Sequence, residues 1–274
     1  MDSVRPAKRQ RTSGYISPPL GDECAVQPLA RNRDESRRMS KAVNVLKVEA
    51  EALAQVAILY ETDDTARNGL GSAVDRILDA QDYGGKLIVC GVGKSAYIGS
   101  KLVATCKSLG IRASFLHAAE AAHGDLGDIR SEDVLLFVSF SGRTPELLNL
   151  LPHIPESTCV IAMSSSPTRK ECQLLGEHED AILLPTPIHE KEEATFGVCA
   201  PTTSTTVTLA VADMLALTIA DELHSGKTKE VFKRNHPGGA IGLKNRASNP
   251  VEVPVSDVSP VELPSPSISD ESED

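Results

Sequence analysis

The chain has 274 residues and a formal net charge of −10, and its 41% hydrophobic and 24% charged residues are typical of a globular protein. With no tryptophan, four tyrosines and five phenylalanines, it lacks the aromatic platforms on which proteins stack single-stranded nucleic acid. The negative charge also argues against a broad electrostatic attraction to nucleic acid or to an anionic membrane. Six cysteines occur without a Cys-x-x-Cys pair, which argues against a disulfide framework or a zinc cage and favours a reducing compartment.

Charge is distributed unevenly, and the changes mark three segments. Residues 1–38 carry eight Lys or Arg against five Asp or Glu, whereas residues 245–274 carry seven acidic side chains against one Arg. Neither segment has apolar periodicity, so we predict a disordered basic tail at 1–38, one folded domain at 39–244 and a disordered acidic tail at 245–274. The basic run Lys8–Arg11 is either a nuclear import signal or a solvated part of the tail.

Targeting signals are scarce in this sequence. Residues 1–20 lack the apolar core of a signal peptide. The most apolar helical stretch, Val207–Ala220, contains Asp213 and is too short to span a bilayer. We therefore expect a cytoplasmic protein without a membrane partner, and nuclear entry if the basic run acts as a signal.

Short apolar runs alternate with helical patterns through the predicted domain. The runs have no polar face, which is typical of parallel strands covered on both sides. This alternation predicts an α/β fold, a three-layer αβα sandwich whose ligand lies beyond the carboxyl ends of the strands. We expect strands at 86–91, 113–116, 133–138, 159–163 and 181–184, and helices at 46–59, around 74–78, at 95–109, 143–152 and 202–223.

The turn Gly-Val-Gly-Lys-Ser at residues 91–95 follows the first strand. A Walker A nucleotide loop is excluded, because Ile88 stands where that motif needs glycine. A dinucleotide-binding turn would need an acidic residue after the next strand, and none is there. A plain tight turn leaves Lys94 unexplained, because a cation in the first turn of a helix opposes the helix dipole. An anionic ligand would explain it.

Three hydroxyl side chains, Ser139, Ser141 and Thr144, lie within six residues between a strand and a helix. Free backbone N–H groups and the positive end of a helix dipole meet there, which predicts a phosphate-binding loop. An ordinary helix cap would need only one of the hydroxyls. A second hydroxyl cluster, at residues 202–206, opens the last long helix, where some members cap the helix and others can reach the same ligand.

Five segments together resemble the sugar isomerase (SIS) domain family, and within it the D-arabinose 5-phosphate isomerases. The resemblance covers residues 45–245 and implies a five-stranded parallel sheet. It also implies interconversion of D-ribulose 5-phosphate and D-arabinose 5-phosphate without a cofactor. Many full-length members add a pair of cystathionine-β-synthase modules, which we do not expect in this chain. The segments are Gly91–Ser95, Ala119–Gly127, Ser139–Gly142, Ala200–Thr206 and His236–Gly242.

The same resemblance implies the residues of the active site. Because relatives build their sites at subunit contacts, we also expect a homo-oligomer, specifically a tetramer, with a sugar phosphate as its small-molecule partner. The implied catalytic residues are Lys94, Glu146, Glu193 and His236, and the sequence leaves open which of the last three is the general base. The expected substrate-binding residues are Gly93, Ser95, His123, Ser139, Ser141, Thr144, Thr202 and Thr203.

The spacing of His117, Glu120, His123 and Asp125 invites comparison with a metal site. It lacks the adjacent histidine of the known helical zinc motifs, and an enediolate isomerisation can proceed without metal. We therefore expect no metal here and a substrate contact for His123.

Two other functions fit parts of the pattern. A regulatory protein that binds sugar phosphates without turnover would need only the phosphate loop, and a hexulose 6-phosphate isomerase would differ in the loops that face the sugar. Isomerisation needs a base to move a proton and a cation or acid to stabilise the enediolate. Retention of all four catalytic residues therefore favours the enzyme.

Overall fold

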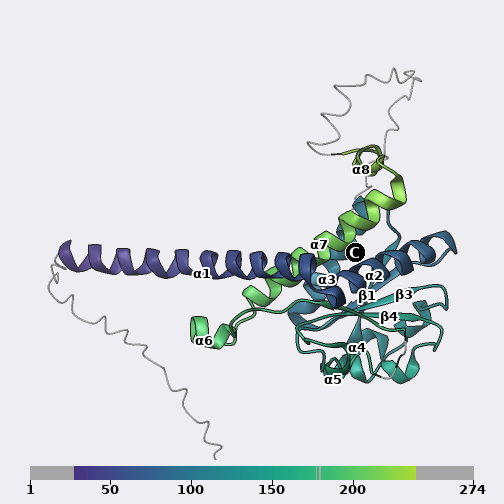
Figure 1. The fold of residues 1–274 in the computed structure, drawn as a ribbon, viewed down its shortest axis with the longest axis horizontal. Coiled ribbons are helices and arrows are strands. Elements are labelled where there is room, and N and C mark those ends of the chain that lie inside the picture. The colour runs from purple at the N-terminus through teal and green to yellow at the C-terminus, as the bar shows by residue number, and fades with distance from the viewer. Residues whose placement is uncertain (1–27, 177, 179, 239–274) are drawn as a thin grey trace, which may run out of the picture. The chain divides into compact units, whose positions relative to one another are not determined.

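The computed structural model describes residues 28–176, 178 and 180–238 (Figure 1). Most of the two predicted tails, the basic run Lys8–Arg11 and the segment from residue 239 onward lie outside the described residues. The chain divides into two units, Met1–Lys47 and Val48–Asp274. The folded core and the candidate site belong to the second.

Helix α1 (Pro28–Thr62) begins much earlier than the helix expected at 46–59. It includes residues 28–38, which were expected to belong to the disordered basic tail. No glycine or proline interrupts residues 29–62, so nothing in the local sequence stops a helix there. Proline is also well tolerated at the first position of a helix, where its missing N–H would have no helical partner.

Five parallel strands form the centre of the Val48–Asp274 unit, in the order β2-β1-β3-β4-β5. This arrangement confirms the α/β class and the five-stranded parallel sheet. In register, Gly91 pairs with His117 and Val138 pairs with Met163, so the carboxyl ends of neighbouring strands meet at one edge of the sheet. The strands are β1 (Leu87–Gly91), β2 (Ala113–His117), β3 (Val134–Val138), β4 (Cys159–Ser164) and β5 (Ile182–Pro185).

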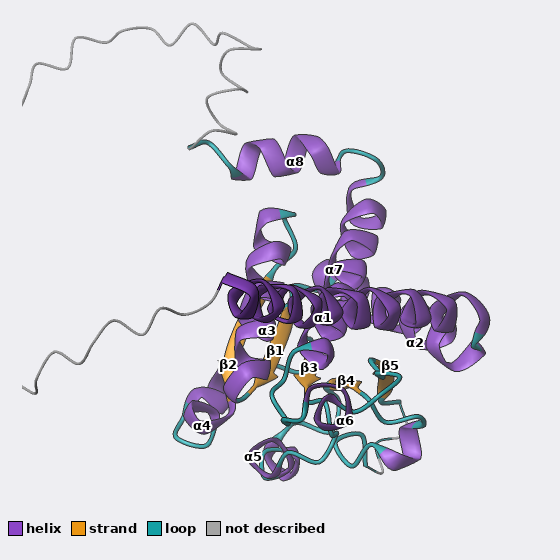
Figure 2. Ribbon diagram, turned by 90° about the vertical axis from the view of Figure 1, so that its left-hand side faces the viewer, coloured by secondary structure: helices purple, strands orange, loops and turns teal. Residues whose placement is uncertain are grey.

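Helices cover both faces of the sheet, as the sandwich prediction requires. Figures 1 and 2 show α2, α3 and α7 on one face and α4 and α5 on the other. The helices after α1 are α2 (Asp64–Asp82), α3 (Gly93–Ser108), α4 (Ala118–Ala121), α5 (Pro145–Leu148), α6 (Glu192–Phe196), α7 (Thr203–His224) and α8 (Thr228–Asn235). Single 3₁₀ turns lie at Asp125–Asp128, Leu151–His153 and Arg169–Glu171.

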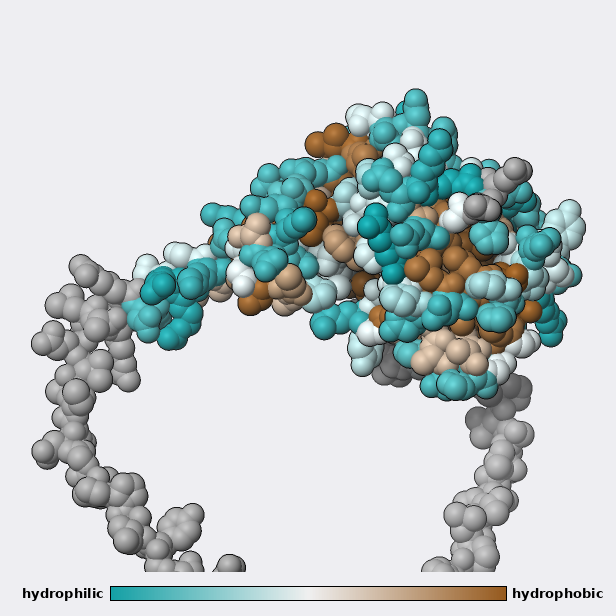
Figure 3. All heavy atoms as spheres, turned by 90° about the horizontal axis from the view of Figure 1, so that it is seen from below, coloured by the Kyte–Doolittle hydropathy of each residue, from teal (hydrophilic) through white to brown (hydrophobic). Residues whose placement is uncertain are grey.

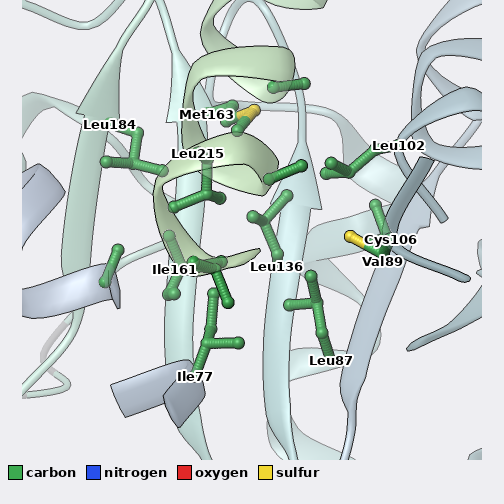
Figure 4. Close-up of a cluster of buried hydrophobic side chains, with 14 of the residues drawn as sticks. Ile77, Leu87, Val89, Leu102, Cys106, Leu136, Ile161, Met163, Leu184 and Leu215 are labelled. Carbon is green, nitrogen blue, oxygen red and sulfur yellow. The ribbon is translucent and has the colours of Figure 1, made fainter. Parts of the chain in front are cut away.

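Successive residues of each central strand enter two separate hydrophobic cores. In β1, Leu87 and Val89 pack toward α2, α3 and α7, whereas Ile88 and Cys90 pack toward α4 and α5. All four are fully buried. Figure 4 shows the first core, in which Leu136 of β3 lies among side chains from neighbouring strands and helices. Two buried faces explain why the strands read as continuous apolar runs in the sequence.

Helix α7 matches the helix expected at 202–223 and extends beyond the apolar stretch Val207–Ala220, which was predicted to be too short to span a bilayer. Its 22 residues have the length and composition to cross a membrane, and 56% of its most apolar window is buried inside the described fold. Val211, Leu215 and Ile219 lie in the core against α2 and α3. A buried core helix satisfies the same test of length and composition, and this packing identifies α7 as one.

The helix predicted at 143–152 is a single turn, α5, followed by a 3₁₀ turn. Pro152 has no N–H to donate, and its ring clashes with the preceding turn of an α-helix. It lies instead at the start of the Leu151–His153 turn, where neither constraint applies.

Candidate active site

A pocket of about 380 Å³ opens beside the carboxyl ends of β1 and β3. Three segments line it: the turn between β1 and α3, the end of β3, and the segment from α6 into α7. We name it the Lys94 pocket. Its lining residues are Lys94, Ser95, Ile98, Val138, Phe140, Glu192, Cys199, Pro201, Ser204, Thr205 and Thr208.

The turn between β1 and α3 places a cation in this pocket. Gly91 allows a close approach, since a Cβ there would lie 3.0 Å from the carbonyl carbon of Ser95. Gly93 has a φ of +57°, which disfavours a side chain. Lys94 stands in the first turn of α3, where no acidic residue accompanies it. Among the described residues it has no carboxylate within salt-bridge distance, which fits the anionic ligand that the sequence suggested.

The predicted phosphate loop follows β3, and its hydroxyls form short local contacts. Ser139 is buried, and its Oγ lies 2.7 Å from the Oγ1 of Thr144. Ser141 is exposed, and its Oγ accepts a hydrogen bond from the N–H of Arg143 at 3.2 Å. Of this loop, Phe140 lines the Lys94 pocket. The exposed hydroxyl of Ser141 is therefore the one most open to an incoming phosphate.

Residues at the end of β4 hold this loop in place. The hydroxyls of Ser164 and Ser165 both donate to the carbonyl oxygen of Phe140, at 3.2 and 2.7 Å. Gly142 has a φ of +64°, and a Cβ there would lie 2.9 Å from both Ser164 Oγ and Ser166 Oγ. The loop shape thus depends on glycine for its backbone angle and for the space around it.

We expect Gly142→Ala to lower the free energy of unfolding by about 1–3 kcal/mol, because strain at positive φ adds to crowding against the β4 serines. Gly84→Ala is the matched control, since Gly84 has a φ of +88° and nothing within 4 Å of the added Cβ. Thermal melts of both variants measure the difference. Equal losses in the two variants would contradict the crowding around Gly142.

Glu146 and His123 lie in a different pocket. This second pocket, of about 520 Å³, lies beside α4 and α5 and also contains His153 and Asn149. Both predicted residues are exposed. The structure therefore brings Glu146 and His123 together in this second pocket and not in the Lys94 pocket.

Of the residues whose spacing invited comparison with a metal site, His117 has a structural role. His117 ends β2, and its Nδ1 accepts a hydrogen bond from the N–H of Ala119 at 3.3 Å, which caps α4. Its ring also meets Phe115 edge to face. Among the described residues, no group of three or more potential ligands is arranged to hold a metal ion.

The segment from α6 to α7 brings Glu192 into the Lys94 pocket, while the predicted catalytic Glu193 is exposed beside it. Glu193 contacts the thiol of Cys199, and this hydrogen bond, together with the carboxylate charge, raises the pKa of that thiol. Cys199 itself lines the pocket. Glu193 is therefore held at the pocket's edge through a lining residue.

The hydroxyl cluster at the start of α7 divides into buried and pocket-facing members. Thr203 is 1% exposed, and its Oγ1 has no hydrogen-bond partner among the described residues. Thr202 contacts the Glu192 carboxylate. Ser204, Thr205 and Thr208 line the pocket. The predicted substrate contacts of Thr202 and Thr203 stay predictions, and the pocket offers three other hydroxyls.

His236 lies at the opposite edge of the sheet from the Lys94 pocket. It follows α8, stacks on Phe232 and has its Nδ1 2.8 Å from the Phe232 carbonyl oxygen. The neighbouring Asn235 donates to the carbonyls of Lys107 and Ser108 at the far end of α3. The 16 residues of α3 span roughly 24 Å from the Lys94 end to that contact. His236 and Lys94 of one chain are thus separated by the length of a helix.

Several lining residues were not predicted from the sequence. Ser204 and Thr205 belong to the hydroxyl cluster predicted at residues 202–206, whereas Thr208 lies outside it. Thr208 follows Ser204 by four residues on α7, and this helical spacing is a signal that could have identified it. The resemblance pointed to Glu193 alone, whereas the path of the loop decides which carboxylate lines the pocket, and in the structure Glu192 does.

The comparisons with known proteins agree with this architecture. Residues 84–218 match the model of the SIS domain, and every residue that lines the Lys94 pocket lies in that range. Residues 84–218 of the chain therefore form a SIS domain. The chain is homologous to arabinose 5-phosphate isomerases: it is 40% identical over 201 residues to arabinose 5-phosphate isomerase KdsD of Yersinia pestis, covering 73% of this chain and 56% of that protein. The chain spans little more than half the length of the first curated relatives it matches.

Solved structures show the same fold. A Bacteroides fragilis protein described as a phosphosugar isomerase involved in capsule formation is 29% identical, with a TM-score of 0.62, covering 74% of this chain and 98% of that one. An Escherichia coli CFT073 protein solved in complex with arabinose 5-phosphate is 26% identical, with a TM-score of 0.60, covering 77% and 98%.

Proposed function

We propose that this chain is a phosphosugar isomerase that interconverts D-ribulose 5-phosphate and D-arabinose 5-phosphate. The observation that carries the proposal is the Lys94 pocket, in which an ammonium group and several hydroxyls meet at the carboxyl edge of the sheet. The homology to arabinose 5-phosphate isomerase and the similarity to a structure that holds arabinose 5-phosphate support a pentose phosphate as the substrate.

The proposed reaction moves one proton between C1 and C2 of the sugar through an enediolate. Lys94 has no carboxylate partner among the described residues, so its charge is available to stabilise an oxygen that becomes negative. Glu193 is our candidate for the base, since it is exposed at the edge of the same pocket. Glu146 and His236 would act from other segments.

We assign the substrate phosphate to the loop of residues 139–144. The N–H groups of Ser139, Gly142 and Arg143 already donate hydrogen bonds within the protein. The other N–H groups of the loop and the hydroxyl of Ser141 lie after the end of β3, and Phe140 of the same loop lines the pocket. Binding energy from the phosphate would hold the sugar in line with the reacting groups.

We expect Ser141→Ala to raise KM by about tenfold and to lower kcat by less than threefold or so, because the hydroxyl binds a group that does not react. Steady-state kinetics and calorimetry with the sugar phosphate measure the two effects. A fall confined to kcat would contradict the assignment of Ser141 to the phosphate.

A single chain does not assemble the four predicted catalytic residues in one pocket. We propose that a homo-oligomer, a tetramer, completes the site and that a second copy supplies His236. Exposed apolar side chains are available for such contacts, including Ile58, Tyr97 and Leu217. Figure 3 shows hydrophobic groups reaching the surface among hydrophilic ones on one face of the molecule.

The proposed activity is tested by incubating the purified chain with D-ribulose 5-phosphate and following the aldose product directly, with a hexulose 6-phosphate in parallel. Formation of arabinose 5-phosphate supports the proposal. If only the hexulose 6-phosphate is turned over, the proposed pentose phosphate substrate is wrong. If the sugar phosphate binds without any turnover, the regulatory protein is the better description.

A further inference from the structure

Helix α6 lies over the Lys94 pocket without being part of either hydrophobic core. None of its side chains, Glu192 to Phe196, is buried. Gly197 ends it in the left-handed conformation, with a φ of +75°. A five-residue helix without buried side chains has too few contacts to hold a fixed place by packing. Polar contacts must therefore fix α6, and these can be identified.

The carboxylate of Glu192 ties α6 to the first turn of α7. Its Oε1 accepts hydrogen bonds from the N–H groups of Thr202 and Ser204, at 2.6 and 3.0 Å. The same oxygen accepts from the hydroxyl of Ser204 at 2.8 Å and lies 3.4 Å from that of Thr202. Figures 1 and 2 show α6 beside the start of α7.

This contact replaces the usual helix cap. Thr202 stands at the N-cap of α7, yet its side chain makes no capping hydrogen bond. The free N–H groups at the start of a helix need an acceptor, and a negative charge there also complements the helix dipole. Glu192 supplies both from another segment of the chain.

The same donors make Glu192 a poor general base. Partial burial raises the pKa of the Glu192 carboxyl, but the hydrogen bonds from Thr202 and Ser204 together outweigh burial and leave the pKa below its usual value. A carboxylate already engaged by several donors holds a proton weakly. The role that fits Glu192 is therefore structural support of its neighbours.

We propose that Glu192 is a positioning residue: its carboxylate fastens α6 to the start of α7 and so holds Glu193 and Cys199 at the mouth of the Lys94 pocket. Glu193 follows Glu192 directly on α6 and contacts Cys199, which lines the pocket. Movement of α6 would displace Glu193 from the sugar. The catalytic consequence rests on the proposed isomerase function, whereas the fastening of α6 does not.

The test compares Glu192→Ala and Glu192→Gln with the parent chain. We expect Glu192→Ala to speed amide exchange in residues 192–204 by about tenfold or more, with other peptides unchanged. Its kcat should fall by at least tenfold or so, and its KM should change much less, because the phosphate loop is untouched. Glu192→Gln should lie between, since an amide oxygen accepts hydrogen bonds without the charge.

Glu171→Gln is the matched control. Glu171 is an exposed acid that accepts one hydrogen bond from Thr168 Oγ1 at 2.9 Å, and it does not line the Lys94 pocket. It should leave both exchange in residues 192–204 and kcat unchanged.

The readouts separate the two proposals. Unchanged exchange at residues 192–204 in Glu192→Ala would overturn the fastening of α6, whether or not the parent turns over. Faster exchange with unchanged kcat in an active enzyme would overturn the positioning of Glu193. A parent chain without turnover would refute the isomerase, while the exchange measurement would still decide whether Glu192 holds α6.

Discussion

Glu193→Gln should lower kcat for the isomerisation by about 10²–10⁴-fold, the usual contribution of a general acid or base. Glutamine keeps the size and hydrogen-bonding shape of glutamate but cannot take a proton at neutral pH. Sugar-phosphate binding should change by less than about threefold, because the phosphate loop is intact. Turnover measures the first effect and calorimetry the second.

The control for this variant is again Glu171→Gln, which removes an exposed carboxylate that does not line the pocket. Wild-type turnover in Glu193→Gln would show that Glu193 is not the base. A large loss of binding with little change in kcat would reassign Glu193 to substrate affinity.

Lys94→Ala and His236→Ala should each abolish most activity alone and should regain part of it when mixed and reassembled. The two residues lie at opposite edges of the sheet within one chain, so a shared site would take one from each of two copies. Random pairing of the two variants leaves roughly a quarter of the sites with both native residues. Activity should therefore return toward that fraction after subunit exchange.

Sedimentation of the parent chain at micromolar concentration accompanies this test, with a tetramer as the expected result. A monomer in sedimentation, or two active-site variants that never complement, would contradict a site shared between copies. A mixture of Lys94→Ala and Glu193→Gln is the control. If one chain supplies both residues to the same pocket, every site in this mixture lacks one of them, and no activity should return.

Much of the fold could be predicted because the strands are buried on both faces. The run Val134–Val138 is apolar at every position, and all five side chains are buried in the structure. A short run that is apolar at every position is typical of a strand that is covered on both faces of the sheet. By contrast, α6 and α8 bury no side chains, so neither leaves an apolar stripe for a sequence pattern to detect.

The candidate site was predictable in its segments and less so in its geometry. The turn carrying Lys94 and the hydroxyls that open α7 do meet in one pocket, because the carboxyl ends of parallel strands lie at one edge. The place of His236 depends on the direction that α8 takes after α7, which no local pattern encodes. The choice between Glu192 and Glu193 depends on a loop held by polar contacts rather than by packing.

The most direct test of the central claim is conversion of D-ribulose 5-phosphate by the purified chain in D₂O. If the reaction passes through an enediolate with a protein base, the product is D-arabinose 5-phosphate carrying solvent deuterium at C2, which NMR detects. Lys94→Ala in the same buffer should form at least tenfold or so less product, because the enediolate loses its cation. Absence of arabinose 5-phosphate from the parent reaction, or equal product formation by the parent and Lys94→Ala, would contradict the account.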